Sequence, residues 1–220
     1  MSIIKKIISY KKSFFRNRGN NNHVFIINAN GDRREIHRLK NSIIKFKGDN
    51  NTIEIYMPYD DLVLNITVYD NTNIILKPSQ YPRNICIIGY YNNNNNIVFG
   101  RDFSTTNKLQ IFLLRGPGDI TIGDDCMFAS YDLIQLGDGH AMYSIKTNEI
   151  INNNKDIIVG NHVWVADNVT LLKGTKICDN CIVGTKSVVT KQFNQNNIVI
   201  AGVPAKNVKS EINWIRKSQY

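Results

Sequence analysis

Residues 159–189 read VGNHVW VADNVT LLKGTK ICDNCI VGTKSV V when the sequence is divided into groups of six. A branched aliphatic residue begins every group, and these residues are Val159, Val165, Leu171, Ile177, Val183 and Val189. The fifth position of each group is small or β-branched, and it holds Val163, Val169, Thr175, Cys181 and Ser187. Neither a helix nor a long strand has a period of six. We therefore expect short strands joined by tight corners, whose coils stack around one continuous core.

Polar residues between the aliphatic positions fit such corners. They occur as the pairs Gly160-Asn161, Asp167-Asn168, Lys173-Gly174 and Asp179-Asn180. Gly, Asn and Asp adopt backbone angles that most residues avoid, so they suit tight turns. The alternative is an ordinary β-sandwich with accidental spacing, and the unbroken run of aliphatic positions argues against it.

The repeat continues upstream, with one interruption. Ile122, Phe128 and Ile134 keep the period of six, which then stops and resumes at Val159. An interruption in a solenoid is usually a loop that leaves a corner, and such loops tend to carry function. We therefore expect an excursion loop over about 138–156. Further upstream, polar corners precede alternating strands whose first isoleucines recur every 21 to 23 residues, at Ile53, Ile74, Ile97 and Ile120. These strands are expected to form earlier, less regular coils.

Composition and charge limit the class of protein. The chain has 220 residues and a mass of 25.1 kDa, which suits one domain. No run of 18 apolar residues is present, and lysines break the N-terminal apolar stretch, so we expect a cytosolic protein with reduced cysteines. The net charge of +9 lies at the two ends, because residues 1–31 and 201–220 are basic while the acidic and basic residues between them balance.

Two short helices are expected at the ends. Residues 1–18 place isoleucines and phenylalanines near helical spacing among lysines, as in a basic amphipathic helix. This segment could cover the first coil of the solenoid, or residues 1–17 could contact a membrane surface or an acidic polymer. At the other end, Ile212 and Ile215 suit a short helix within residues 207–220. The solenoid itself is expected over residues 19–206.

The stretch IIVGNHVWVADNVTLLKGTKICDNCIVGTKSVVTKQFNQNNIVIAGVPAK, residues 157–206, resembles the hexapeptide-repeat acetyltransferases. Within that superfamily, DGHAMYS followed by KDIIVGNHVW looks closest to O-acetyltransferases that modify sialic acid capsular polysaccharide. The resemblance implies an all-β fold, a left-handed parallel β-helix with triangular coils of three hexads. It also implies a homotrimer that binds acetyl-CoA between neighbouring subunits.

His140 lies at the start of the interruption, in the sequence Asp138-Gly139-His140. Transfer of an acetyl group from a thioester to a sugar hydroxyl needs a base, and histidine can accept the proton near neutral pH. In the family, the histidine of the D-x-H motif performs this role, so the resemblance implies that His140 is the general base. Asp138 could orient the imidazole ring or only shape the turn, and both possibilities remain open.

Trp164 is expected to point outward, because it alternates with Val163 and Val165. The resemblance places Trp164 in the active site, lining the CoA channel, although packing on a neighbouring subunit is the alternative. His162 has the same outward parity and suggests a surface or interface role. The resemblance maps the remaining CoA contacts onto Asp167, Thr185, Lys186, Thr190, Lys191, Lys206 and Lys209. Family members often have glycine at the position of Lys186, which makes that residue a departure from the pattern.

The resulting hypothesis is an acetyl-CoA-dependent O-acetyltransferase that acts on a capsular or surface polysaccharide, with a carbohydrate acceptor and no nucleic-acid partner. It would work in the cytoplasm near the inner face of the membrane. The alternatives are an N-acetyltransferase acting on an amino sugar nucleotide and a non-enzymatic solenoid that binds polyanions. No metal site is expected, because Cys178 and Cys181 differ in parity and no second cysteine pair exists.

Overall fold

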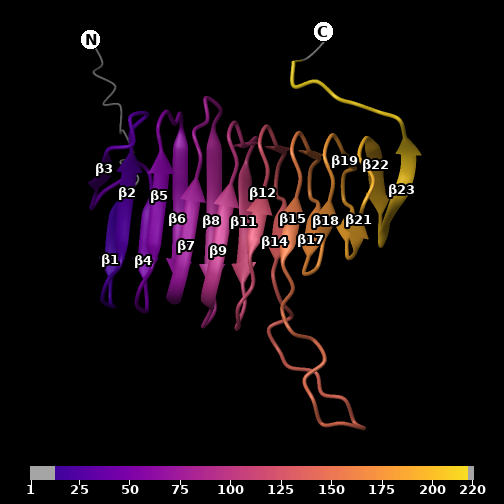
Figure 1. The fold of residues 1–220 in the computed structure, drawn as a ribbon, viewed down its shortest axis with the longest axis horizontal. Helices are drawn as coiled ribbons and strands as arrows, with labels where there is room; N and C mark the ends of the chain where they lie inside the picture. The colour runs from indigo at the N-terminus through magenta and orange to yellow at the C-terminus, as the bar shows by residue number, and fades with distance from the viewer. Residues whose placement is uncertain (1–12, 218–220) are drawn as a thin grey trace, which may run out of the picture.

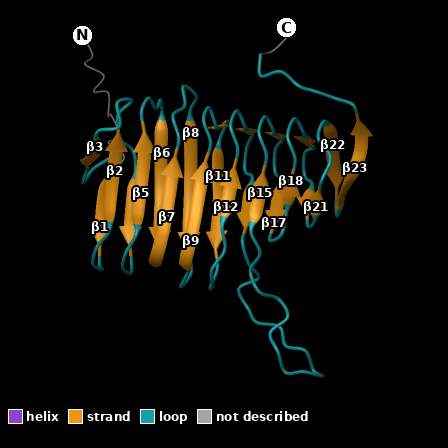
Figure 2. Cartoon of the chain, in the orientation of Figure 1, coloured by secondary structure: helices purple, strands orange, loops and turns teal. Residues whose placement is uncertain are grey.

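The computed structural model describes residues 13–217, which form three β-sheets and contain no helix (Figures 1 and 2). The eight-stranded sheet contains β1 (Phe14–Asn17), β4 (Ile43–Phe46), β6 (Leu62–Val68), β8 (Arg83–Gly89), β11 (Lys108–Leu113), β14 (Leu133–Gln135), β17 (Thr170–Leu172) and β20 (Val188–Val189). The nine-stranded sheet contains β21 (Gln192–Phe193), β18 (Lys176–Ile177), β15 (Ile157–Val159), β12 (Ile120–Ile122), β9 (Asn93–Phe99), β7 (Asp70–Leu76), β5 (Thr52–Tyr56), β2 (His23–Ile27) and β3 (Arg33–Glu35). The six-stranded sheet contains β10 (Ser104–Thr105), β13 (Met127–Phe128), β16 (Trp164–Val165), β19 (Ile182–Val183), β22 (Ile198–Gly202) and β23 (Ala205–Ser210).

From β9 onward the chain visits the three sheets in a fixed order, so that each coil is a triangle. We name the three corners by the sheets they join. Edge I leads from the eight-stranded to the nine-stranded sheet, edge II from the nine-stranded to the six-stranded sheet, and edge III from the six-stranded to the eight-stranded sheet. Neighbouring coils pair in parallel, except for the antiparallel strands β3 and β23 at the two ends. This is the stacked-coil architecture that the period of six predicts.

The expected inward positions form the core. All six aliphatic positions from Val159 to Val189 are at most 1% exposed, and so are the five small positions between them. Leu171 pairs with Val189, 18 residues later, which equals three groups of six. Ile134 pairs with Leu171, 37 residues later, because the excursion loop is inserted between them. The register from Ile122 to Val189 is therefore confirmed.

The earlier coils follow the longer repeat. Ile53 pairs with Ile74, Ile74 with Ile97, and Ile97 with Ile120, all in the nine-stranded sheet. The third side of the first coils has no named strand and is marked only by a parallel bridge between Tyr59 and Ser79. The four isoleucines thus occupy equivalent places, as the sequence predicts.

The corners use the polar residues as expected. Asn168, Gly174 and Asn180 all have positive φ angles, of 59°, 78° and 58°. Lys186 has the same left-handed conformation with φ 58° at edge III, where a glycine would be unstrained. The backbone at Lys186 therefore has a conformation that glycine adopts more readily than lysine does.

The N-terminal helix expected over residues 1–18 is not confirmed. Residues 1–12, which make up the greater part of the predicted helix, lie outside the described residues. Residues 14–17 form β1, which pairs in parallel with β4. A strand is favoured here because its backbone forms hydrogen bonds along the open edge of β4, which a helix cannot do.

The C-terminal helix expected over residues 207–220 is wrong for the described part. Ala205–Ser210 is β23, antiparallel to β22, and residues 211–217 are irregular. This segment runs back over the coils instead of extending the solenoid (Figure 1). Trp214, at 6% exposed, is buried against edge II, so contacts with the coils replace helical hydrogen bonds. No helix that could cross a membrane is found among residues 13–217.

Candidate active site

The excursion loop leaves edge I after β14 and returns at β15, and it protrudes from the stack of coils (Figure 1). Its base is fixed by Asn152, which is 9% exposed. The Asn152 side-chain amide donates hydrogen bonds to the carbonyl of His140 and to a carboxylate oxygen of Asp138, both 2.8 Å long. Its side-chain oxygen accepts a bond of 2.8 Å from the backbone of Met142. One residue therefore joins the outgoing and returning strands of the loop beside His140.

His140 opens into a cleft of about 490 Å³, here called the His140 cleft. The lining residues are Arg115, Gly116, Pro117, Asp138, Gly139, His140, Ala141, Ile150, Asn152, Asn153 and Asn154. His140 is exposed, and its ring has no hydrogen-bond partner among residues 13–217. The backbone of His140 is thus held in place by Asn152 while its ring is free to meet an acceptor.

Asp138 shapes the loop in this structure. Its carboxylate accepts a bond of 2.5 Å from Lys173 Nζ in addition to the bond from Asn152. Lys173 Nζ also donates to the carbonyl of Asn152, over 2.7 Å. These contacts, with Lys173 the strongest, lower the pKa of Asp138 below its usual value. Of the two roles left open by the sequence, the contacts match that of shaping the turn.

A second cleft of about 450 Å³ lies beside the first and contains four lysines, so we call it the lysine cleft. Its lining includes Lys155, Lys173, Lys176 and Lys191 together with Thr190. Thr190 and Lys191 were expected to contact CoA, and the structure places them here. Lys155, Lys173 and Lys176 were missed by the sequence argument. Lys155 lies on one coil at edge I, and Lys173 and Lys176 lie on the next coil, so extending the register to polar residues could have found them.

Trp164 lies on a different side of the molecule. It belongs to β16 in the six-stranded sheet, between Met127 and Ile182 on the neighbouring coils. Its ring is half-buried and lies 6.1 Å from the ring of Trp214. The outward orientation is confirmed, and a neighbour from the same chain partly covers the ring. Trp164 and His140 are not brought together within one chain.

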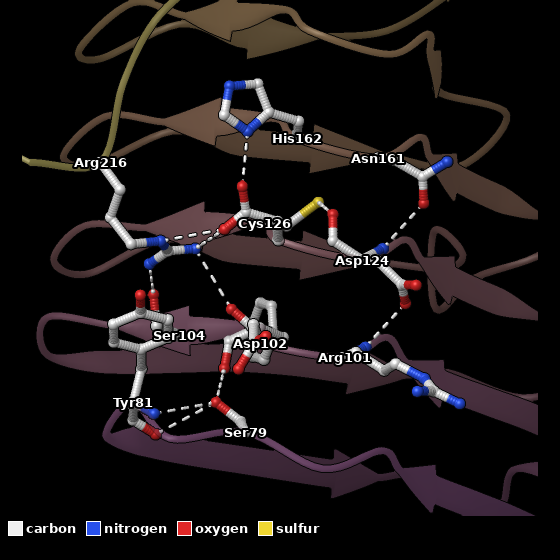
Figure 3. Close-up of polar contacts among 12 residues, drawn as sticks. Ser79, Tyr81, Arg101, Asp102, Ser104, Asp124, Cys126, Asn161, His162 and Arg216 are labelled. Carbon is white, nitrogen blue, oxygen red and sulfur yellow. Dashed lines mark hydrogen bonds and ion pairs between the residues drawn. The ribbon is translucent and has the colours of Figure 1, made fainter.

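His162 is at edge II, and its partners come from the C-terminal segment and the preceding coil (Figure 3). Its Nδ1 lies 2.6 Å from the carboxylate of Asp125. Arg216 donates two bonds to the other oxygen of Asp125, of 3.0 and 2.9 Å, and a third of 2.6 Å to the hydroxyl of Ser104. Figure 3 shows these side chains arranged across successive coils. His162 therefore anchors the C-terminal segment, which agrees with the surface role inferred from its parity.

The other residues expected to contact CoA lie away from edge I. Asp167, Thr185 and Lys186 are exposed at edge III, where the Asp167 carbonyl accepts a bond of 3.0 Å from the Lys186 amide. Lys206 and Lys209 are exposed on β23, the last strand of the six-stranded sheet. The proposed CoA residues thus form two groups on one chain, one at edge I and one on and beside the six-stranded sheet.

The cysteines offer no nucleophile beside His140. Cys126 is fully buried, and burial raises its pKa to about 12. All four cysteines are unpaired thiols. No group of three His, Cys, Asp or Glu side chains suited to a metal ion is found in the part of the chain that the structure describes.

Parallel coils of three hexads with a histidine-bearing loop define the class of hexapeptide-repeat transferases. The family model "Bacterial transferase hexapeptide (six repeats)" matches residues 156–191. A polysialic acid O-acetyltransferase of Neisseria meningitidis is 34% identical over 199 residues, which cover 90% of this chain and 78% of that relative. The chain belongs to the hexapeptide-repeat acetyltransferase family, and it is an O-acetyltransferase.

Two solved structures share the fold over most of their length. The polysialic acid O-acetyltransferase OatWY matches with a TM-score of 0.62 and 29% identity, over 94% of this chain and 93% of that one. The polySia-specific acetyltransferase NeuO matches with a TM-score of 0.64 and 24% identity, over 94% of this chain and 90% of that one. The second likeness concerns the fold alone.

Proposed function

We propose that the chain transfers the acetyl group of acetyl-CoA to a hydroxyl of a sialic-acid-containing capsular polysaccharide, with His140 as the general base. The observation that carries this proposal is the adjacency of the two clefts at edge I. The Asp138–Lys173 ion pair lies between the exposed His140 ring and the lysine cleft. A base thus stands next to a group of cations suited to phosphates. The similarity to polysialic acid O-acetyltransferases supports polysialic acid as the acceptor.

His140 would accept the proton of the acceptor hydroxyl as its oxygen forms a bond to the acetyl carbon. When bound, acetyl-CoA supplies the acetyl group as a thioester, whose carbon–sulfur bond breaks as the ester forms. The proton held on His140 then passes to the sulfur, so the imidazole ends the cycle neutral. Because the Cys126 thiol is buried and protonated, transfer would be direct, without an acetyl-enzyme.

The separation of the two groups of CoA residues supports a homotrimer. In such an assembly, the six-stranded sheet of one subunit, with Trp164, Asp167, Thr185 and Lys186, would face the His140 cleft of its neighbour. The excursion loop also exposes apolar side chains, including Met142, Tyr143 and Ile145, which would find partners on a neighbouring subunit. Light scattering of the intact chain should give three times 25 kDa, and a monomer with full activity would contradict this assembly.

The decisive experiment compares acceptors side by side. Release of free thiol from acetyl-CoA is measured with polysialic acid, neutral capsular polysaccharides and amino sugar nucleotides. Fast, alkali-labile acetylation of polysialic acid is expected, because an ester is formed. Preferential acetylation of an amino sugar nucleotide would favour the N-acetyltransferase alternative, and binding of polyanions without thiol release would favour the non-enzymatic one.

A role near the membrane is part of the same proposal and rests on residues 1–17. Residues 1–12 are outside the described residues, so a solution experiment must decide. Lipid flotation of the intact chain is compared with that of a variant lacking residues 1–17. Equal flotation of the two forms would remove membrane contact by this segment.

A further inference from the structure

A row of aromatic and cationic side chains follows edge I from the early coils to the His140 cleft. Lys47 Nζ lies 5.3 Å from the centre of the Tyr69 ring. The Tyr69 and Tyr91 rings lie 4.9 Å apart at an angle of 37°. The Arg115 guanidinium lies 5.7 Å from the centre of the Tyr91 ring. Each member therefore contacts the next, which lies on the following coil.

The register of the eight-stranded sheet places these residues in line. Phe46 pairs with Val68, so Lys47 and Tyr69 follow at the same level on adjacent coils. Gly89 pairs with Leu113, which brings the residues after each strand, including Tyr91 and Arg115, to the same corner. Adjacent parallel strands are about 4.8 Å apart. The fold thus spaces one side chain per coil along the edge.

The row begins in a cationic hollow. A cleft of about 260 Å³ is lined by Arg16, Arg18, Lys45, Phe46 and Lys47. Arg18 belongs to the same line, because its backbone amide bonds to the carbonyl of Phe46 over 3.1 Å. None of these cations forms an ion pair within residues 13–217, where the ion pairs involve other residues.

Two carboxylates at this edge accept hydrogen bonds from backbone amides of the corners. Asp49 accepts a bond of 2.7 Å from the amide of Asn20, and Asp70 accepts one of 2.8 Å from the amide of Asp49. Both serve the turn, and neither forms an ion pair with the cations of the row among residues 13–217. Such an arrangement attracts anions from solution.

The other end of the row enters the candidate active site. Arg115 lines the His140 cleft, and its carbonyl accepts a bond of 3.2 Å from the Asn154 side chain, which also lines that cleft. Tyr91 is 65% exposed, so its ring is accessible to a ligand on this path. Exposed cation–aromatic pairs contribute little to stability, so both the rings and the cations of this row are available to a ligand.

We propose that the edge I row, defined as Arg18, Lys47, Tyr69, Tyr91 and Arg115, binds an extended anionic polysaccharide and leads it to His140. This inference rests on the proposed function and specifies how its acceptor is held. Carboxylates of successive sugars pair with the cations, while sugar rings stack on Tyr69 and Tyr91. Five steps of about 4.8 Å between Arg18 and His140 give a path of roughly 24 Å, far longer than one sugar. The enzyme therefore prefers long chains to short ones.

The test uses sialic acid oligomers of increasing length as acceptors for the full chain and for the double variant Arg18→Gln/Lys47→Gln. In the unmodified enzyme, KM should fall as the oligomer lengthens. In the double variant, KM for long chains should rise roughly three- to tenfold, the range expected from two exposed charge contacts. Tyr91→Ala should also raise KM for long chains. The matched control is Lys77→Gln, which removes a lysine placed 4.3 Å from the Tyr56 ring at edge II and should change nothing.

A direct binding measurement separates this inference from the proposed function. Polysialic acid is titrated onto the enzyme without acetyl-CoA, at low and high salt, and circular dichroism confirms that each variant is folded. Binding that weakens with salt and in the double variant supports the row. A KM independent of chain length, or equal in the variant and the unmodified enzyme, would overturn it while leaving acetyl transfer intact. Absence of acetyl transfer to any sialic acid acceptor would instead overturn the proposed function.

Discussion

The imidazole ring of His162 lies parallel to the indole ring of Trp214, with 4.2 Å between the ring centroids and 9° between the planes. Two hydrogen bonds join the same residues. His162 Nε2 bonds to the Trp214 carbonyl over 2.9 Å, and Trp214 Nε1 donates to the His162 carbonyl over 2.8 Å. Because a carbonyl oxygen can only accept a hydrogen bond, His162 Nε2 and Trp214 Nε1 each carry the hydrogen in these bonds. The C-terminal segment is thereby fixed to edge II by stacking and by reciprocal hydrogen bonds.

Trp214→Ala should therefore destabilise the chain by about 3 kcal/mol, as expected when a buried tryptophan is truncated. Chemical denaturation followed by circular dichroism measures the loss. Ile215→Ala is the matched control, because Ile215 is 60% exposed and next in sequence. Equal stabilities for the two variants would show that the segment does not hold the fold.

His140→Ala should lower kcat by roughly two to four powers of ten, the contribution of a positioned general base. Binding of CoA, measured by calorimetry, should change little because the ring does not line the lysine cleft. His37→Ala, an exposed histidine of the early coils, should keep full activity. A trapped acetyl group on any residue would contradict direct transfer.

Asn152→Ala should lower kcat roughly ten- to hundredfold, because the backbone of His140 loses its anchor and a displaced base is inefficient. The melting temperature should stay almost constant, since the excursion loop lies outside the coils. The same substitution at the exposed neighbour Asn153 provides the control for the loss of an asparagine from this cleft. If KM for the acceptor rises and kcat is unchanged, Asn152 binds substrate and does not position the base.

Asp132 makes stability depend on pH. Its side chain is 2% exposed, one carboxylate oxygen accepts a bond of 2.9 Å from the Val169 amide, and the other has no partner among the described residues. Burial raises its pKa to about 7, above the value of roughly 3.9 in an unfolded chain. The folded state therefore binds the proton more tightly, and stability falls as the pH rises from about 4 to about 7.

Asp132→Asn tests this dependence because asparagine does not ionise. Melting temperatures of both forms are measured between pH 4 and pH 8. The variant should gain roughly 3–8 °C on the unmodified chain across this range, and the difference should level off above pH 7. A constant difference would mean that Asp132 does not change its protonation state within this range.

Val183→Asp should abolish folding, because the new carboxylate would lie at a fully buried position without a partner. Val188→Asp places the same charge at a half-buried, outward position on the next strand and should be tolerated far better. The proportion of soluble, folded protein from each variant measures the effect. A folded Val183→Asp variant would be incompatible with the hexad register.

The sequence predicted the coils well because their cause is local and repeated. When a branched aliphatic residue recurs every six positions, only one arrangement of the coils buries all of these side chains. The inward positions from Ile122 to Val189 could therefore be assigned without coordinates. The interruption at Ile134 likewise located the excursion loop. Asp138 and His140 could be placed in that loop, although their partners Asn152 and Lys173 could not, because contacts across coils depend on the path of the loop.

The C-terminal end was mispredicted for a physical reason. Spacing near that of a helix, as for Ile212 and Ile215, reports only which side chains share a face. A segment beside a sheet edge or a groove can satisfy its backbone and bury one large residue without forming a helix, as residues 205–214 do. The edge I row was also hidden, because irregular coils of 21 to 24 residues align Lys47, Tyr69, Tyr91 and Arg115 only once strand pairing is known.

Arg216 has a consequence for how the protein is made. A solenoid synthesised from its N-terminus can add each coil to the one before, so that order grows in step with translation. The bond from Arg216 to Ser104 joins residues 112 positions apart, across several coils. The coils that carry Ser104 and Asp125 are therefore synthesised long before Arg216. Their hydrogen bonds with Arg216 can form only after the ribosome has completed the C-terminal segment.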